Sequence, residues 1–185
     1  MSPTRQAVCV LLILVAAVEF HWATASCCCP AMWTAFGNHC YRFFSYSRSW
    51  FEAEGHCRSF TSPSVGSGEG SPSALAHLAS IHSQAENDFL HTFFETSRAR
   101  NDSQPLGVYA TLWIGLHDLE EEGVFVWSDE TPVDFENWAA NQPNNSGTGP
   151  NSDCVSLLGG YIGKWHDRWC RALTKQYICK MPYVY

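Results

Sequence analysis

The chain has 185 residues, enough for one ordinary domain, and a formal net charge of −7. That acidic balance argues against nucleic acid and anionic membrane surfaces as partners. The amino terminus is typical of a secretion signal, because Arg5 precedes an apolar run from Val8 to Phe20 and a small-residue cleavage pattern at Ala23-Thr24-Ala25. A membrane anchor is the alternative, but the run is short and contains Glu19. We therefore predict a cleaved signal peptide and no membrane span.

Removal of residues 1–25 leaves a secreted domain at residues 26–185 and changes how its cysteines are interpreted. Cys9 leaves with the signal, so eight of the nine cysteines remain: Cys27, Cys28, Cys29, Cys40, Cys57, Cys154, Cys170 and Cys179. In an oxidising compartment an even set indicates disulfides. A zinc site is the alternative, but no two cysteines have C-x-x-C spacing. Spacing alone leaves the pairing open.

Two helix starts stand in the first half of the chain. Ser49-Trp50-Phe51-Glu52 and Ser83-Gln84-Ala85-Glu86 both have the capping-box pattern. Apolar residues at helical spacing follow each box, and we assign them to the core: Trp50, Ala53, Cys57 and Phe60, then Phe89, Leu90, Phe93 and Phe94. Thr61 to Ser73, rich in Gly, Ser and Pro, predicts a surface loop. A second polar loop is predicted from Arg98 to Gly107, with a glycosylation sequon at Asn101.

The second half predicts short strands separated by one long loop. The expected strands are Leu112 to Leu116, Val124 to Trp127, Val155 to Leu158 and Tyr177 to Lys180. Asp134 to Pro150 is rich in turn residues, and long loops in compact domains are usually functional or disordered. Cysteines and aromatic residues return immediately afterwards, which favours an ordered, pinned loop.

Taken in order, these motifs resemble the C-type lectin domain. Its opening is matched by Cys29-Pro30-Ala31-Met32-Trp33 and Cys40-Tyr41, and its central strands by Trp113-Ile114-Gly115-Leu116 and Gly123-Val124-Phe125-Val126-Trp127-Ser128-Asp129. Gln142-Pro143-Asn144 stands at the family's sugar-specificity triplet, and Trp165-His166-Asp167 at its Trp-Asn-Asp motif. The match runs from about Cys29 to Lys180. The short secreted form is similar to echinoidin-type and other invertebrate humoral lectins.

The resemblance implies an α+β fold, in which two helices flank two small, mostly antiparallel sheets and a long ligand-binding loop projects from one end. It also implies the disulfides Cys29–Cys40, Cys57–Cys179 and Cys154–Cys170. The Cys57–Cys179 bond would tie the first helix to the last strand. It would contribute up to about 4–5 kcal/mol in the chain-entropy model.

The family's site holds calcium, and the sugar's neighbouring hydroxyls complete the shell of the ion. Calcium takes about six to eight hard oxygen ligands. The resemblance carries this site onto Gln142, Asn144 and Asp167, with Asn151 or Asp153 in place of an expected Glu, and these are the predicted metal ligands. The predicted carbohydrate-binding residues are Gln142, Asn144, His166 and Asp167. Pro143 is expected to follow a cis peptide bond, as in the family.

The site departs from the family pattern in three ways. His166 replaces an Asn, and imidazole is a poor calcium ligand. The backbone oxygen of His166 remains available to the ion. Ser152 falls where the Glu is expected, so acidic charge is lost, and charge count tunes calcium affinity. The triplet combines the first residue of the galactose type with the last of the mannose type, so no sugar is assigned. Asn144-Asn145-Ser146 is itself a glycosylation sequon, and a glycan on Asn144 would crowd the site.

These residues predict a secreted lectin that depends on calcium and binds extracellular or cell-surface glycans or glycoproteins. The alternative is a calcium-independent module that binds protein or extracellular or mineral matrix, because a fold of this kind does not fix its ligand. An enzyme is not expected: the chain has no nucleophile elbow, phosphate-binding Gly loop or zinc motif, and Asp134 and Glu136 lie in a solvated turn. Trp165 and Trp169 have the chemistry to stack on a sugar, but core packing is the more common role.

The three implied pairs leave Cys27 and Cys28, adjacent at the new amino terminus. We predict that one or both link chains into a disulfide-bonded homo-oligomer, because an exposed thiol in a secreted protein tends to pair between molecules. A vicinal disulfide is the alternative, but its ring is far from preferred geometry. Two other possibilities remain. Cys27 or Cys28 could replace Cys29 as the partner of Cys40, or both could be capped by small thiols. Linked sites would bind multivalent glycans with avidity.

Overall fold

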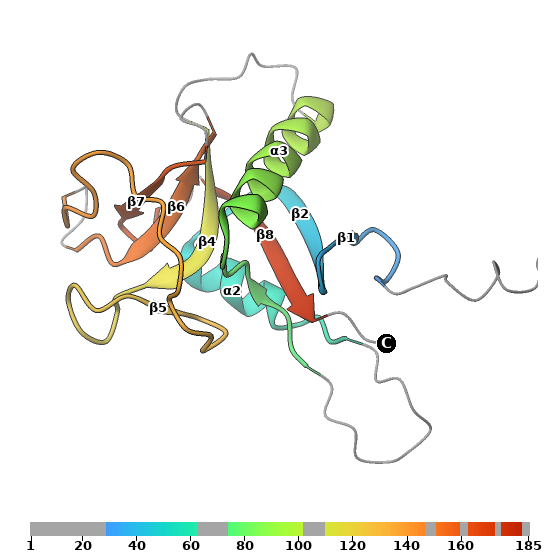
Figure 1. The fold of residues 1–185 in the computed structure, drawn as a ribbon, viewed down its shortest axis with the longest axis horizontal. Helices are drawn as coiled ribbons and strands as arrows, with labels where there is room; N and C mark the ends of the chain where they lie inside the picture. Colours follow the sequence, from blue (N-terminus) through green and yellow to red (C-terminus); the bar gives the residue numbers. More distant parts are fainter. Residues whose placement is uncertain are drawn as a thin grey trace, which may run out of the picture.

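The computed structural model describes residues 29–62, 74–101, 110–146, 151–159, 163–172 and 175–182 (Figure 1). The predicted signal peptide, Cys27, Cys28 and most of the loop predicted after Thr61 lie outside these residues. The described helices are α2 (Trp50–Cys57) and α3 (Gln84–Asn101). The strands are β1 (Thr34–Phe36), β2 (His39–Arg48), β3 (His77–Leu78), β4 (Thr111–His117), β5 (Val126–Trp127), β6 (Cys154–Leu158), β7 (Trp165–Arg168) and β8 (Lys175–Pro182).

Both predicted capping boxes begin helices, but only the first is closed in both directions. Ser49 Oγ accepts the amide of Glu52, and the Glu52 carboxylate accepts the amide of Ser49 at 3.0 Å. Ser83 Oγ likewise accepts the amide of Glu86 at 3.2 Å, but the Glu86 carboxylate is buried in the core. The second box therefore supplies a helix start and a buried charge.

Helix α3 continues through Asn101, so the loop predicted from Arg98 was placed too early. Arg and Ala are strong helix formers, and the stretch Arg98-Ala99-Arg100 extends the helix by about one turn. The predicted glycosylation site at Asn101 is the last residue of this helix, and the rest of its sequon lies outside the described residues.

The strands form one eight-stranded mixed sheet in the order β1-β2-β8-β4-β6-β7, with β3 paired to β8 and β5 to β4. All pairings are antiparallel except that of β4 with β8, where Leu112 faces Gln176 and Trp113 faces Tyr177. The resemblance implied two small sheets, but the structure has one. Strand β4 is buried along both faces and pairs at both edges, with β6 and β8, so it joins the two parts into a single sheet. The α+β class and its two flanking helices are confirmed.

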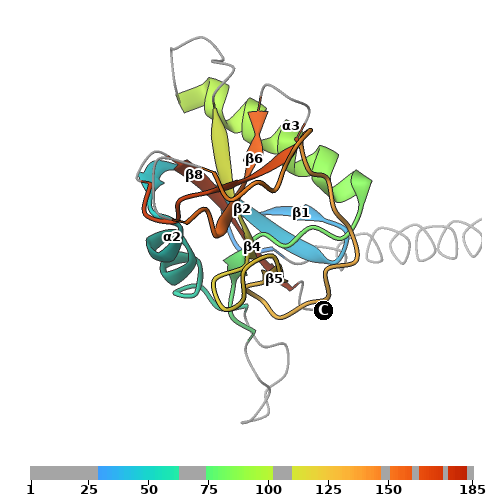
Figure 2. The ribbon, with the colours of Figure 1, turned by 90° about the vertical axis from the view of Figure 1, so that its left-hand side faces the viewer.

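Alternate side chains of β4 separate two cores on opposite faces of the sheet. Ile114 and Leu116 pack in the same cluster as Phe94 of α3, whereas Trp113 packs in that of Trp50 of α2. The two helices accordingly cover different faces, as Figure 2 shows. The indole nitrogen of Trp50 donates to the Ile114 carbonyl at 2.8 Å, which fixes α2 against the central strand.

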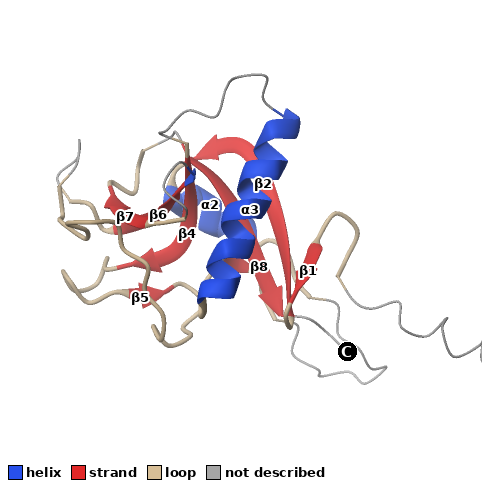
Figure 3. Cartoon of the chain, turned by 45° about the horizontal axis from the view of Figure 1, so that its top comes forward, coloured by secondary structure: helices blue, strands red, loops and turns tan. Residues whose placement is uncertain are grey.

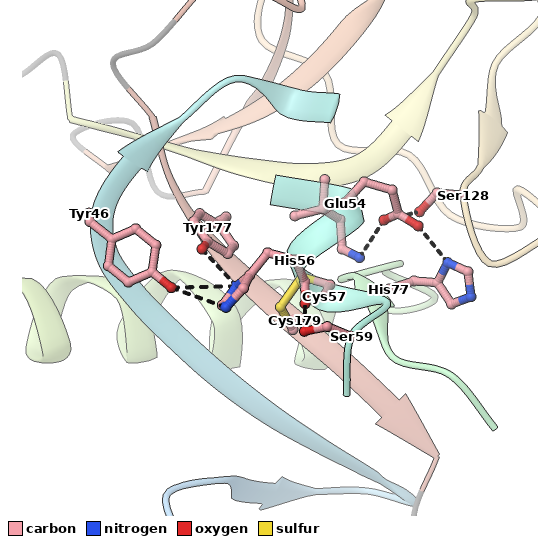
Figure 4. The surroundings of a disulfide bond; sticks show 10 residues. Tyr46, Glu54, His56, Cys57, Ser59, His77, Ser128, Tyr177 and Cys179 are labelled. Carbon is pink, nitrogen blue, oxygen red and sulfur yellow. Dashed lines mark hydrogen bonds and ion pairs between the residues drawn. A yellow bond between two sulfur atoms is a disulfide. The ribbon is translucent and has the colours of Figure 1, made fainter. Parts of the chain in front are cut away.

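The structure contains the three implied disulfides, Cys29–Cys40, Cys57–Cys179 and Cys154–Cys170. The second of them joins α2 to β8 and closes a sequence separation of 122 residues (Figure 4). Beside it, His56 is held between two phenol groups: Tyr177 Oη lies 2.9 Å from its Nδ1 and Tyr46 Oη 3.2 Å from its Nε2. The disulfide therefore lies inside a packed aromatic layer.

Candidate functional site

The predicted ligand-binding loop lies between β5 and β6, and its base is fixed to β7. The backbone amide of Trp165 donates to the Asn137 carbonyl at 2.9 Å, and that of Ala139 donates to the Trp165 carbonyl at 2.8 Å. The Cys154–Cys170 disulfide ties the start of β6 to the residues after β7. Loops gather beside β5 and β7, on the side away from β1 and the carboxyl terminus (Figure 3).

Asp167 of β7 holds the turn that carries the specificity triplet. Its carboxylate accepts the backbone amide of Asn144 at 3.1 Å and that of Asn145 at 2.5 Å. The side chain is 3% exposed, so these bonds are shielded from water. The Gln142–Pro143 peptide bond is cis, as the family resemblance implies. The turn that follows Gln142 is thus fixed to β7 through Asp167.

Asn145 links this turn to two other segments. Its Nδ2 donates to Glu122 Oε2 at 2.7 Å, and its Oδ1 accepts the backbone amide of Ser152 at 2.8 Å. With the bond from its backbone amide to Asp167, one side chain and its amide connect the loop to β7, to the turn before β5 and to the segment before β6. Asn145 was predicted only as part of a sequon, so its linking role is new.

Four carboxylates surround this connection: Asp118, Glu122, Asp153 and Asp167. The pKa of the Glu122 carboxyl is raised, first by desolvation and then by the negative charges of the other three. Glu122 is exposed, so we give more weight to the neighbouring charges than to desolvation. Their contribution to the pKa shows that the other three carboxylates lie close to Glu122. Burial, and then the charge of Asp118, also raise the pKa of Asp153. The loop therefore concentrates negative charge that a cation would relieve.

Several oxygens at this site are buried without a hydrogen-bond partner among the described residues: Gln142 Oε1, Asp118 Oδ1 and Ser152 Oγ. Such oxygens are costly unless a ligand, ion or water satisfies them. Within the described residues no group of three or more His, Cys, Asp and Glu side chains is placed to hold a metal. The donor set instead mixes amide, hydroxyl and carboxylate oxygens, which fits calcium rather than zinc.

The side chains of the other predicted site residues have different surroundings. The His166 side chain is 5% exposed and lies against Ser156 Oγ, 3.1 Å from its Nε2, and against Arg168. Asn144 Oδ1 accepts the amide of Ser146 at 2.9 Å and also its hydroxyl, so it closes its own turn. Asn151 is exposed and Asp153 half-buried.

The two tryptophans near β7 have different surroundings. Trp165 is fully buried and its indole nitrogen donates to Asn87 Oδ1 at 2.8 Å, so its role is in the core. Trp169 is half-buried and lines a surface hollow.

Sequence reasoning missed Asp118 and Glu122. A signal was present, because a turn directly after a buried, mostly apolar strand contains four acidic residues, Asp118, Glu120, Glu121 and Glu122. Like charges are not placed together without cost. Such a run after a buried strand marks a candidate cation-binding turn.

The disulfide-bonded α+β fold with a loop built on β7 defines a class of extracellular binding domain, and the comparisons name it. The family model of the lectin C-type domain matches residues 72–181, and the chain belongs to this family. It is 40% identical to echinoidin of Heliocidaris crassispina over 155 residues, 84% of this chain and 97% of echinoidin. It is 38% identical to the α-N-acetylgalactosamine-specific lectin of Patiria pectinifera, over 81% of this chain and 78% of that lectin.

The solved structures agree with the sequence relatives. The C-type lectin CEL-I from Cucumaria echinata superposes with a TM-score of 0.66 at 32% identity, covering 82% of this chain and 96% of CEL-I. CEL-IV superposes with a TM-score of 0.69 at 32% identity, covering 85% and 96%. Within the described residues no helix is both long enough and apolar enough to cross a membrane.

Proposed function

We propose that this chain is a secreted, calcium-dependent lectin that binds extracellular glycans at the loop between β5 and β6. The observation that carries the proposal is the turn after Gln142, which the Asp167 carboxylate holds through the backbone amides of Asn144 and Asn145, with the Gln142 Oε1 atom buried and without a partner among the described residues. The relatives named as lectins support the glycan class. The disulfides support an oxidising, extracellular location.

Gln142, Asn144 and Asp167 would hold calcium from the loop and β7, with Asn151 or Asp153 from the segment before β6 and the backbone oxygen of His166. When bound, the ion offers coordination positions to neighbouring sugar hydroxyls. The chain's own residues set the geometry: Asp167 orders the turn through two amides, and Asn145 holds that turn to Glu122 and Ser152. Calcium affinity and loop conformation are therefore coupled.

A glycan array, run with calcium and again with a chelator, tests the proposal. The relatives include proteins named for α-N-acetylgalactosamine and for mannose, and the triplet Gln142-Pro143-Asn144 is a hybrid, so the array must present both sugar types. Signal that appears with calcium and disappears with chelator is the expected result. Absence of any glycan signal in either buffer would contradict it.

Two features favour the second candidate, a calcium-independent module that binds protein or matrix. Ser152 offers a hydroxyl where the family has a carboxylate, and the His166 imidazole is buried against Ser156 and Arg168. Isothermal calorimetry with millimolar calcium separates the two candidates. A chain that releases or absorbs no heat, yet binds a matrix protein equally in chelator, would establish the second.

We also propose disulfide-linked assembly through Cys27 or Cys28, which lie outside the described residues. Non-reducing electrophoresis of the secreted protein should give a dimer or larger band that reduction converts to monomer. A Cys27→Ser/Cys28→Ser variant is the matched control, because it leaves all three observed disulfides intact. A monomer band in the parent would rule out covalent assembly.

N-glycosylation is proposed at the two sequons of the secreted chain. Asn144 is exposed, but its Oδ1 is engaged by Ser146 in the turn that also carries the triplet. Asn101 ends α3. Mass spectrometry before and after enzymatic removal of N-glycans would count the occupied sites, and the array should then be repeated on deglycosylated protein.

A further inference from the structure

A hollow of about 220 Å³ opens beside the ligand loop, on the side of α2. It is lined by Phe51, Leu119, Asn151, Asp153, Trp169 and Arg171. Asn151 and Asp153 are the two alternative calcium ligands of the proposed site, and Ser152 between them is hydrogen-bonded to Asn145 of the ligand loop, so the hollow adjoins the proposed glycan site. A larger hollow of about 570 Å³ beside β5 shares none of these residues.

Aromatic and apolar side chains form the walls of the smaller hollow, and two of them are exposed. Phe51 is 44% exposed and Leu119 37%. The Trp169 indole nitrogen donates no hydrogen bond to the described residues. Exposed apolar groups gathered at a hollow with a few polar groups are typical of binding sites.

The polar groups of the hollow carry both signs. The Arg171 guanidinium lies 6.0 Å from the centre of the Phe51 ring and forms no ion pair with the described residues. Arginine only donates hydrogen bonds, a carboxylate such as Asp153 only accepts them, and the Asn151 amide does both. One cation and one carboxylate leave little net charge. A ligand that suits these polar side chains is neutral and rich in groups that both donate and accept hydrogen bonds.

We propose that this hollow is a second sugar subsite, which binds a neutral pyranose of an oligosaccharide whose terminal sugar is held at the ligand loop. A pyranose has hydroxyls that donate and accept, and its ring C–H face is apolar and packs on Phe51 and Trp169. The volume lies below the range of about 300–1,000 Å³ for drug-sized ligands, which suits a single ring. This inference rests on the proposed function, and it makes the chain selective for oligosaccharides over single sugars.

Calorimetry in calcium tests the subsite with defined probes: the methyl glycosides of galactose, N-acetylgalactosamine and mannose, and trisaccharides that end in the same sugars. In the parent, the trisaccharide with the preferred terminal sugar should bind about tenfold more tightly than its methyl glycoside, equivalent to about 1.4 kcal/mol. In Phe51→Ala and Arg171→Ala that ratio should fall close to one, while the affinity for the methyl glycoside is unchanged.

Two matched variants control for the loss of an exposed apolar or cationic side chain. Met32→Ala removes a side chain that is 77% exposed, and Arg58→Ala removes an exposed arginine at the other end of α2. Both should keep the parent's ratio. Phe51→Leu guards against a folding defect, since it keeps an apolar side chain on the helix but removes the flat ring, and it should also lower the ratio.

The outcomes separate the two proposals. Equal affinity of the parent for trisaccharide and methyl glycoside, or an unchanged ratio in Phe51→Ala and Arg171→Ala, would overturn the subsite and leave the proposed function standing. A parent that binds no glycan in calcium would overturn both.

Discussion

A buried carboxylate, Glu86, and a group of four carboxylates at the ligand loop have opposite surroundings. Glu86 is 6% exposed, and its carboxylate accepts hydrogen bonds from Tyr41 Oη at 2.5 Å, Lys180 Nζ at 2.7 Å and the His82 amide at 2.8 Å. At the ligand loop, no lysine or arginine of the described residues pairs with Asp118, Glu122, Asp153 or Asp167. Glu86 has its cation within the fold, whereas the four carboxylates at the loop have no lysine or arginine partner among the described residues, as the proposed calcium site requires.

The difference appears in the direction of the pKa shifts. Burial alone would raise the pKa of Glu86, but the charge of Lys180 and the hydrogen bonds outweigh burial and lower it. The pKa values of Glu122 and Asp153 are raised instead. Ionisation therefore stabilises the folded state at Glu86 and opposes it at Glu122 and Asp153. The contrast separates a carboxylate that is paired within the fold from those of the proposed calcium site, and isosteric substitutions test it.

Glu86→Gln should have the largest effect on stability. It preserves shape but leaves the Lys180 ammonium, which is 4% exposed, without its counter-charge. Breaking one partner of a buried pair costs about 3–5 kcal/mol. Urea unfolding monitored by tryptophan fluorescence measures the loss. Glu120→Gln is the matched control at an exposed position and should stay within about 0.5 kcal/mol; a similarly small loss in Glu86→Gln would contradict the structural role of the pair.

Asp167→Asn should weaken calcium binding by about 10- to 100-fold, since a hydrogen bond or contact to a charged group contributes about 1.5–3 kcal/mol. The variant also removes the charge that holds the amides of Asn144 and Asn145. Calorimetric titration with calcium is the measurement. Asp88→Asn, at an exposed position on α3, is the control. Parent-like affinity in the Asp167 variant would remove Asp167 from the site.

His39 should make stability depend on pH in the mildly acidic range. Burial, and then the charge of Lys180, lower its pKa to about 4 from 6.5. Between those values the unfolded chain binds a proton that the folded chain does not, so stability is lost as pH falls from about 6.5 to 4, by about 1–3 kcal/mol. His56 and His117 shift in the same direction, so parent and His39→Gln must be compared. The variant should show a shallower decline in urea unfolding; parallel curves would exclude His39 as the source.

Glu122→Gln should have the smallest effect, and its sign is opposite to that of Glu86→Gln. Without calcium it removes one like charge from the loop, so the melting temperature should rise slightly at neutral pH. Because the pKa of Glu122 is raised, this gain should shrink as pH falls into the acid range and the carboxyl protonates. Calcium should bind more weakly, by less than about tenfold. A fall in melting temperature without calcium would show that the carboxylate is not repelled.

The helix starts and much of the core were predictable from sequence, because their causes lie within a few residues. Ser49 and Glu52 are three positions apart, and their reciprocal bonds formed as the pattern predicts. The disulfide pairs came from the family resemblance, since cysteine spacing alone left them open. The long strand β2 was missed because its buried positions do not alternate. β7 was missed because it buries the polar side chains of His166 and Asp167.

The remaining site could not be predicted because its contacts join distant segments. Glu86 and Lys180 are 94 residues apart, and the capping-box pattern assigned the Glu86 carboxylate to a local role. The bond from Asn145 to Glu122 spans 23 residues and depends on how the turn after β4 meets the ligand loop. The triplet and Asp167 were predicted only because the family pattern named them. The acidic neighbours that surround them required the fold.

The strand order has a practical consequence for anyone who handles this protein. β1 and β7 occupy opposite ends of the path β1-β2-β8-β4-β6-β7, and the last residue of β8, Pro182, pairs with His39 close to β1. Both described ends of the chain therefore lie on the side away from Asp167 (Figure 1). An affinity tag, a fluorescent reporter or a biosensor attachment placed next to either described end, Cys29 or Pro182, should leave the loop facing outward. Immobilised protein should consequently retain its full binding capacity, whereas random coupling through surface carboxylates would consume the loop itself.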